Sequence, residues 1–193
     1  LYIGILGVAE YNEIYNICMF VDDIGAVGAG GMMEFGGTIR YNYIHDIGKQ
    51  SVIDLGSAAI YWDNNANCAN IYGNVINNVA GRGILIGGGR AFNITGNLIM
   101  NCSMIGITYD DRGMIFDEGK GMYNGFKYLM EFSKKPYCTA EAWIAAFPWI
   151  TKINYDPDQT DLEAPGFPGI PGDSVVKDNV YVMTMGETGL YNK

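Results

Sequence analysis

The sequence predicts an all-β fold, a parallel β-helix in which each coil of the chain contributes a few short strands. A cassette of the form apolar-x-x-Asn-x-apolar recurs along the chain, and Asn74 and Asn97 lie 23 residues apart, a spacing typical of one solenoid coil. Each cassette precedes a short apolar run, and we expect the 27 glycines to fall at the bends between such segments. Because one coil cannot bury its own apolar face, we expect the coils to stack.

The cassettes place the first strands and bends of successive coils. Complete copies begin at Ile39, Ile71, Ile94 and Val176, and a shorter match surrounds Asn12. Alignment on the asparagine of the cassette gives one column: Asn12, Asn42, Asn74, Asn97 and Asn179. Stacked asparagine side chains can hydrogen-bond along such a column, and asparagine tolerates left-handed turn geometry. We therefore expect an asparagine ladder at one corner of the coils.

The apolar runs that follow predict a second set of strands at 59–62, 83–86 and 106–109. They are rich in β-branched and aromatic residues, are bounded by Gly, Asn or Asp, and are too short for helices. The alignment gives an apolar column of Val27, Ile60, Ile84 and Ile107. At the ends of the same strands it gives a second column of Asp63, Gly87 and Asp110.

Two segments depart from the repeat. Residues 49–57 are an insertion in the second aligned coil, and insertions in solenoids map to loops, often on the binding side. Residues 112–173 lack the cassette and contain a helix-like stretch from Thr139 to Phe147 and several prolines. We expect one β-helix domain over 1–193, with 112–173 as a non-repeat insertion that packs on the solenoid. Residues 1–7 resemble a strand of a preceding coil, so we expect the chain to be part of a longer protein.

Composition narrows the function classes. The formal net charge is -9 with only 12 Lys and Arg residues, which argues against nucleic acid and anionic membranes as partners. No apolar run is long enough to span a bilayer. Cys18, Cys68, Cys102 and Cys138 have no C-x-x-C spacing, so we expect no metal site and no cofactor. Cys102 aligns with Val79 and Ile47 and is expected to be a core residue.

Carboxylates at strand ends are the candidates for chemistry. Strands of neighbouring coils lie about 4.8 Å apart, so Asp residues in stacked coils can approach the separations that glycoside hydrolysis uses. The acidic cluster, with the single histidine, comprises Asp22, Asp23, His45, Asp46, Asp63, Asp110 and Asp111. Mutual repulsion can raise the pKa of one carboxyl and so supply a proton donor. The alternative is structural, because Asp is a favoured turn residue.

Tyr61 and Trp62 precede Asp63 in an alternating strand, so one ring points inward and the other outward. An outward ring beside a carboxylate suits a sugar-stacking platform, whereas the alternative role is packing at the edge of a wide coil. His45 is either a proton carrier and substrate donor or a side chain satisfied within the Asn-rich turn.

Several strings resemble right-handed parallel β-helix proteins of bacterial polysaccharide degradation, especially those similar to glycoside hydrolase family 141. They are 20–26 (FVDDIGA), 40–47 (RYNYIHDI), 59–63 (AIYWD), 83–90 (GILIGGGR) and 109–113 (YDDRG). The resemblance implies a right-handed β-helix and a secreted or periplasmic enzyme that acts on plant or host glycans. It also implies a catalytic aspartate pair on neighbouring coils, here Asp23, or Asp22, with Asp63.

We therefore predict hydrolysis of glycosidic bonds in a polysaccharide or oligosaccharide, with Asp23 and Asp63 as the acid and its partner. The residues expected to line the subsites are His45, Asp46, Trp62, Arg90, Asp110, Asp111 and Arg112. Two alternatives remain open. A polysaccharide lyase would need a Lys, Arg or His base and a cation to neutralise a uronate carboxylate. A structural or adhesive β-helix would bind glycans without turnover.

Overall fold

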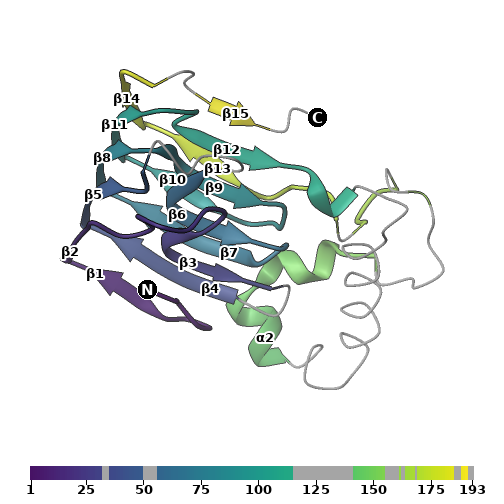
Figure 1. Ribbon diagram of the computed structural model, residues 1–193. Helices are drawn as coiled ribbons and strands as arrows, with labels where there is room; N and C mark the ends of the chain where they lie inside the picture. The colour runs from purple at the N-terminus through teal and green to yellow at the C-terminus, as the bar shows by residue number, and fades with distance from the viewer. Residues whose placement is uncertain are drawn as a thin grey trace.

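A computed structural model describes residues 1–31, 35–49, 56–114, 141–154, 161, 164–167, 169–184 and 188–190. The side chains of residues 142, 143 and 188–190 are outside this description. Within it, the protein is mostly β, and Figure 1 shows the strands stacked in layers from the N-terminal to the C-terminal end.

The strands form three five-stranded sheets in which every neighbouring pair is parallel. The first sheet contains β1 (Val8–Glu10), β4 (Phe35–Arg40), β7 (Asn67–Tyr72), β10 (Asn93–Thr95) and β13 (Val175–Lys177). The second contains β2 (Glu13–Tyr15), β5 (Tyr43–Ile47), β8 (Val75–Val79), β11 (Leu98–Cys102) and β14 (Val180–Val182). The third contains β3 (Gly25–Gly30), β6 (Ser57–Asp63), β9 (Gly81–Gly87), β12 (Ile107–Asp110) and β15 (Thr188–Leu190).

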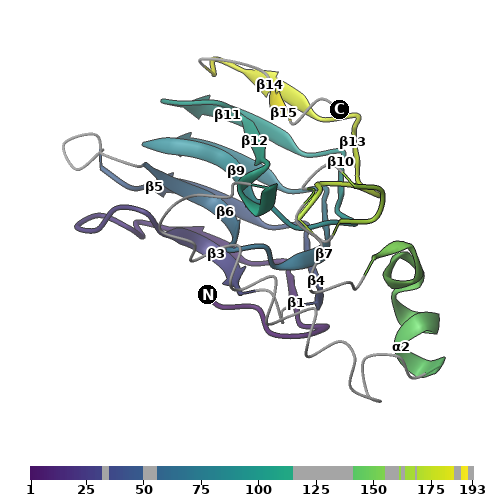
Figure 2. The same ribbon diagram turned by 90° about the vertical axis from the view of Figure 1, so that its right-hand side faces the viewer.

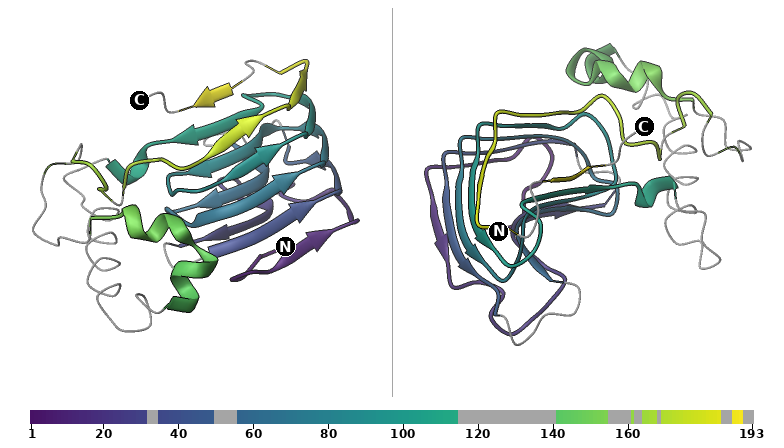
Figure 3. Two further views of the ribbon diagram at one scale, coloured as in Figure 1. Left: turned by 180° about the vertical axis from the view of Figure 1, so that it is seen from behind. Right: turned by 90° about the horizontal axis from the view of Figure 1, so that it is seen from above.

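The chain visits the three sheets in the same order in every round, so each set of three consecutive strands is one coil. Seen from above, successive coils superimpose as nested outlines (Figure 3). Seen from the side, the strands of the third sheet rise one above another, from β3 to β12 (Figure 2). The structure thus confirms an all-β, solenoid-like fold built from stacked parallel strands.

Register confirms the columns that the repeat predicts. Val27 pairs with Ile60, Ile60 with Ile84, and Ile84 with Ile107. Ile47, Val79 and Cys102 share a column in the second sheet, and Cys102 is buried as expected. These inward columns form one continuous core, in which each fully buried aliphatic side chain contributes about 1.5–3 kcal/mol.

The asparagine ladder is present at the corner between the first and second sheets. Each Asn Nδ2 donates to Oδ1 of the Asn in the next coil, at 2.9–3.0 Å from Asn12 through Asn179. The left-handed residue, however, is the one before each asparagine: Tyr11, Tyr41, Gly73, Gly96 and Asp178. The asparagines therefore serve as side-chain connectors between coils, and the preceding residues make the bend.

The segment between β12 and β13 packs against the solenoid through its described part. It contains the short helices η2 (Arg112–Met114), α2 (Glu141–Ala146) and η3 (Pro148–Lys152), and α2 lies outside the outline of the coils (Figure 3). Phe147 and Ile150 form a buried cluster with Cys68 of β7, against which Phe35 of β4 also packs. Thr139, expected to cap the helix, and residues 50–55 of the predicted insertion lie outside the described residues. No helix in the described ranges is both long and apolar enough to cross a membrane.

Candidate functional site

The third sheet carries two adjoining hollows on its outward face. The larger, of about 390 Å³, is the polar lobe, lined by Asn64, Arg82, Leu85, Thr108, Asp110 and Arg112. The smaller, of about 290 Å³, is the glycine lobe, lined by Leu1, Tyr2, Ile24, Gly25, Gly28, Ala29 and Gly30. Three residues line both lobes: Asp23, Tyr61 and Asp63. The predicted aspartate pair therefore stands where the two lobes meet.

Strand β6 places two of these three side chains. Along its outer end the side chains alternate, so Ile60 and Trp62 enter the core while Tyr61 and Asp63 face the groove. Asp23 comes from the preceding coil, just before β3, in a left-handed conformation with φ of 54°. The Tyr61 hydroxyl donates a hydrogen bond to Asp23 Oδ1 at 3.0 Å. Tyr61 thus connects the two coils that supply the carboxylates.

Arg112 organises the polar lobe. Its guanidinium makes ion pairs with Asp63 Oδ1 at 2.5 Å and with Asp110 Oδ2 at 2.6 Å. Its Nε also donates to Asp110 Oδ1 at 2.9 Å. Arg112 therefore bridges two carboxylates that belong to different coils, and the predicted column of Asp63 and Asp110 is joined by a cation.

Gly87 makes this bridge sterically allowed. A Cβ at position 87 would lie 2.7 Å from Arg112 Cζ and 2.7 Å from Asp63 Oδ1. Both contacts are closer than real Cβ atoms show, so the absence of a side chain lets the guanidinium lie between the two carboxylates. The predicted column therefore has a physical reason for its central glycine.

The site shifts two pKa values upward. Burial raises the pKa of the Tyr61 phenol, and the nearby charge of Asp63 adds to this increase. Burial lowers the pKa of the Arg112 guanidinium, but the hydrogen bonds and charges of Asp110, Tyr61 and Asp63 outweigh burial and raise it. Tyr61 therefore stays a neutral hydrogen-bond donor, and Arg112 stays a fixed cation.

Several residues predicted to line the subsites are placed elsewhere. Trp62 is 1% exposed and packs in the core, because its parity along β6 matches that of Ile60. The expectation that Trp62 lines the groove is therefore wrong, and Tyr61 occupies that position. Tyr61 and Asp63 are two residues apart in one strand, so their side chains face the same side. This spacing is the sequence signal that could have identified Tyr61.

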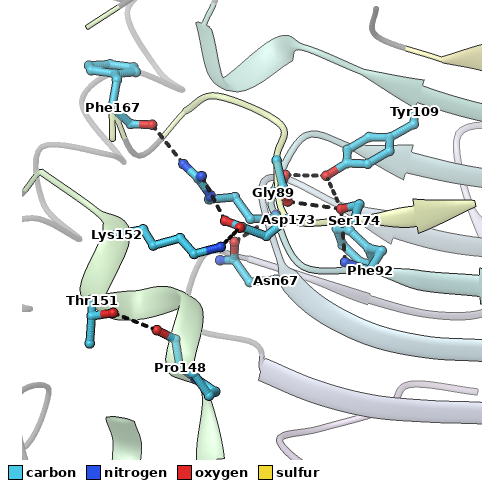
Figure 4. Close-up of polar contacts among 12 residues, drawn as sticks. Asn67, Gly89, Phe92, Tyr109, Pro148, Thr151, Lys152, Phe167, Asp173 and Ser174 are labelled. Carbon is cyan, nitrogen blue, oxygen red and sulfur yellow. Dashed lines mark hydrogen bonds and ion pairs between the residues drawn. The ribbon is translucent and has the colours of Figure 1, made fainter. Parts of the chain in front are cut away.

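Arg90 is also buried and has a structural role, in contrast to the prediction. Its guanidinium donates to the carbonyl oxygen of Phe167 and makes an ion pair with Asp173 at 3.0 Å. Lys152 pairs with the same carboxylate, and Ser174 accepts or donates at 3.0 Å with Tyr109 (Figure 4). The prediction failed because these partners come from a segment far along the chain.

His45 and Asp46 lie on β5 in the second sheet and do not line either lobe. The His45 ring is stacked against the rings of Tyr15 and Tyr43, and its Nδ1 is 2.7 Å from Asp46 Oδ2. The expected clustering of His45 and Asp46 with the aspartates of the groove is therefore wrong, because the bend after β5 separates the second sheet from the third. Asp22 and Asp111 are sequence neighbours of the groove residues Asp23 and Asp110. Neither is among the described residues that line the two lobes.

The cysteines and acidic residues give no metal centre among the residues described. Cys18, Cys68 and Cys102 are free and buried, and Cys138 lies outside the description. No group of three or more His, Cys, Asp or Glu side chains converges there as metal ligands would. Comparison with protein-family models, curated proteins and solved structures gives no significant match for this chain.

Proposed function

We propose that this protein hydrolyses glycosidic bonds in the groove of the third sheet, with Asp23 and Asp63 as its carboxylate pair. The observation that carries the proposal is that Asp23, Tyr61 and Asp63 line both lobes. A bond held at this junction has a carboxylate from each of two coils beside it, as glycoside hydrolysis requires.

The contacts of the two carboxylates favour different roles. Asp63 is paired with Arg112, an interaction that uses the ionised carboxylate, so we assign it the part of base or nucleophile. Asp23 accepts a hydrogen bond from the neutral phenol of Tyr61, which stabilises an ionised carboxylate less than the ion pair of Asp63 does, so we assign Asp23 the part of proton donor. Tyr61 fixes the orientation of Asp23 and is therefore a positioning residue.

The stacked coils of the fold also support a polysaccharide-degrading role. We propose that the stacked parallel sheets form a right-handed parallel β-helix, similar to the polysaccharide-degrading proteins of glycoside hydrolase family 141. A secreted or periplasmic location and a plant or host glycan as substrate belong to the same proposal. The long groove across stacked strands suits a polymeric or oligomeric substrate better than a small molecule.

The lyase alternative has less support in the groove. It needs a Lys, Arg or His that can remove a proton, and the raised pKa of Arg112 opposes that role. The single histidine, His45, lies in the second sheet. A non-catalytic glycan-binding protein is the second candidate, and the bridge from Asp63 through Arg112 to Asp110 favours it, since such a bridge also has a purely structural use.

The test is an activity screen followed by one substitution. The protein is incubated with a panel of aryl glycosides and plant polysaccharides, and released sugar is measured. On the best substrate, Asp63→Asn should abolish hydrolysis and change the melting temperature little, because the amide oxygen still accepts from Arg112. Asp178→Asn, at an exposed corner of another coil, is the matched control and should retain activity.

Full activity of the Asp63→Asn variant would refute the assignment of Asp63. Glycan binding without any released sugar across the panel would favour the non-catalytic candidate. An unsaturated uronate product, detected by its ultraviolet absorbance, would favour the lyase.

A further inference from the structure

We infer that the groove binds a glycan chain across Tyr61, with an uncharged sugar in the glycine lobe, and that Gly30 keeps this lobe open. The inference rests on the proposed function for its substrate class, and it adds the polarity of the substrate and a residue that determines specificity.

The glycines of β3 differ in what they require. A Cβ at Gly25 would lie 2.5 Å from Tyr61 Cβ, and a Cβ at Gly28 would lie 2.0 Å from the Tyr61 carbonyl oxygen. These two positions need glycine for strand packing. Among the described residues, a Cβ at Gly30 would meet only Asp63 Cβ, at an ordinary 3.8 Å, and Gly30 has no left-handed φ. The fold therefore tolerates a side chain at position 30.

The consequence of glycine at position 30 is access to Asp63. Gly30 pairs directly with Asp63 in the register of β3 and β6, so a side chain there would stand beside the carboxylate. Without one, this part of the glycine lobe is backbone bordered by Ile24 and Ala29, and the Gly30 carbonyl oxygen accepts from the Tyr2 hydroxyl at 3.0 Å. A floor of glycine backbone with aromatic and aliphatic neighbours beside a carboxylate suits the apolar face of a sugar ring.

Charge decides which sugar fits this lobe. Its described lining contains the carboxylates of Asp23 and Asp63 and no Lys, Arg or His side chain, and the amino group of Leu1, which also lines it, donates to Ala26 O at 2.7 Å. A uronate placed there would face like charges, so an uncharged sugar is favoured. The polar lobe has different chemistry, because Arg82, Arg112 and Thr108 offer hydrogen-bond donors. The two ends of the bound chain are therefore recognised differently, with Tyr61 between them.

The experiment measures binding, so that it is independent of turnover. The Asp63→Asn variant is titrated calorimetrically with neutral xylo-, manno- and gluco-oligosaccharides from disaccharide to hexasaccharide, and with oligogalacturonides of the same lengths. In a neutral series, oligosaccharides long enough to reach across Tyr61 should bind the protein at least about tenfold more tightly than the disaccharide does. This ratio corresponds to about 1.4 kcal/mol. Adding Gly30→Leu should remove this gain, and Gly30→Ala should remove part of it.

Thr95→Leu places the same leucine side chain on β10 in the first sheet and is the control for position, expected to leave binding unchanged. Melting temperatures verify folding, and Gly30→Ala keeps the test valid if the leucine variant fails to fold. An undiminished length dependence in the Gly30 variants, tighter binding of oligogalacturonides, or no binding of any series would overturn the inference. Length-dependent binding without hydrolysis by the unsubstituted protein would instead overturn the proposed function alone.

Discussion

At the scale of single residues, Asn74 shows how one side chain connects three coils. Its Nδ2 donates to Ile39 O in the preceding coil and to Asn97 Oδ1 in the following coil, both at 2.9 Å. Its Oδ1 accepts from the backbone and side chain of Asn42 at 3.1 and 3.0 Å. Because Asn74 is 1% exposed, water cannot replace these partners.

Asn74→Ala should therefore destabilise the protein strongly. Each buried polar group left without a partner costs about 1–3 kcal/mol, so we expect the free energy of unfolding to fall by about 2–4 kcal/mol. Urea denaturation measures the change. Asn12→Ala removes the same kind of contact at an exposed end of the ladder, and it should cost less than about 1 kcal/mol. Equal losses for the two variants would show that burial does not set the strength of the ladder.

His45 gives a pH-dependent contact between coils. The hydrogen bond with Asp46, followed by one with Glu13 of the preceding coil, raises the pKa of its imidazole although partial burial opposes the change. Since the pKa is raised in the folded state, the stabilising contribution is complete below the unfolded value of about 6.5. It is lost as the pH rises through the folded value.

The chain has a single histidine, so an NMR titration follows this imidazole without ambiguity. We expect its pKa to lie above the ordinary value and to fall in the Asp46→Asn variant, which removes the charge of the largest contributor. Tyr43→Leu, which keeps both carboxylates, should shift the pKa less. A His45 pKa at or below the ordinary value for histidine, unchanged by Asp46→Asn, would disprove this description.

At the scale of elements, β6 shows what local sequence can and cannot supply. Its apolar composition and its alignment with Ile84 and Ile107 were sufficient to predict a strand in the correct register. Alternation was also visible, but choosing which ring points inward requires knowing which column faces the core. Once Ile60 is known to be buried, Trp62 must follow it inward and Tyr61 must face the groove with Asp63.

The contacts of Arg112 and Arg90 mark a second limit. Arg112 belongs to the turn after β12, and its reach to Asp63 depends on Gly87 in the coil between them. The column of Asp63, Gly87 and Asp110 was predictable, and Arg112 was expected to line the same site, but its bridge between the two carboxylates was not predictable. Arg90 depends on Asp173, which is 83 residues away and outside the repeat. Repeat periodicity predicts contacts between aligned positions only, and it is silent about a segment that has no repeat.

At the scale of the whole molecule, the protein has two parts with different cohesion. The coils share one continuous core and pair strand by strand through three sheets. The described part of the segment between β12 and β13 is held by a small cluster around Phe147 and Ile150 and by the ion pairs of Asp173. Fewer buried contacts predict a smaller opening free energy for that segment than for the coils.

Two buried thiols report these openings separately. Cys68 packs beneath Phe147 and Ile150, whereas Cys102 lies in the core column with Val79. Burial raises the pKa of each thiol to about 12, so neither reacts with a thiol reagent while it stays covered. In a background with Cys18→Ser and Cys138→Ser, we expect Cys68 to be labelled faster than Cys102 under native conditions.

Asp173→Asn tests whether the ion pairs of Asp173 with Arg90 and Lys152 keep Cys68 covered. Burial raises the pKa of Asp173, but the hydrogen bonds of Lys152 and Arg90 outweigh burial and lower this pKa overall. The ionised carboxylate therefore stabilises the fold above the pKa of the unfolded chain, and this contribution is lost as the pH falls through the pKa of the folded protein. The substitution removes that charge at neutral pH and should accelerate labelling of Cys68 while leaving Cys102 unchanged. Mass spectrometry of labelled peptides measures both rates. Parallel acceleration of both thiols would mean that the segment and the coils open as one cooperative unit. Cys102 lies in the core column with Val79, so it becomes accessible only when the stacked core itself separates.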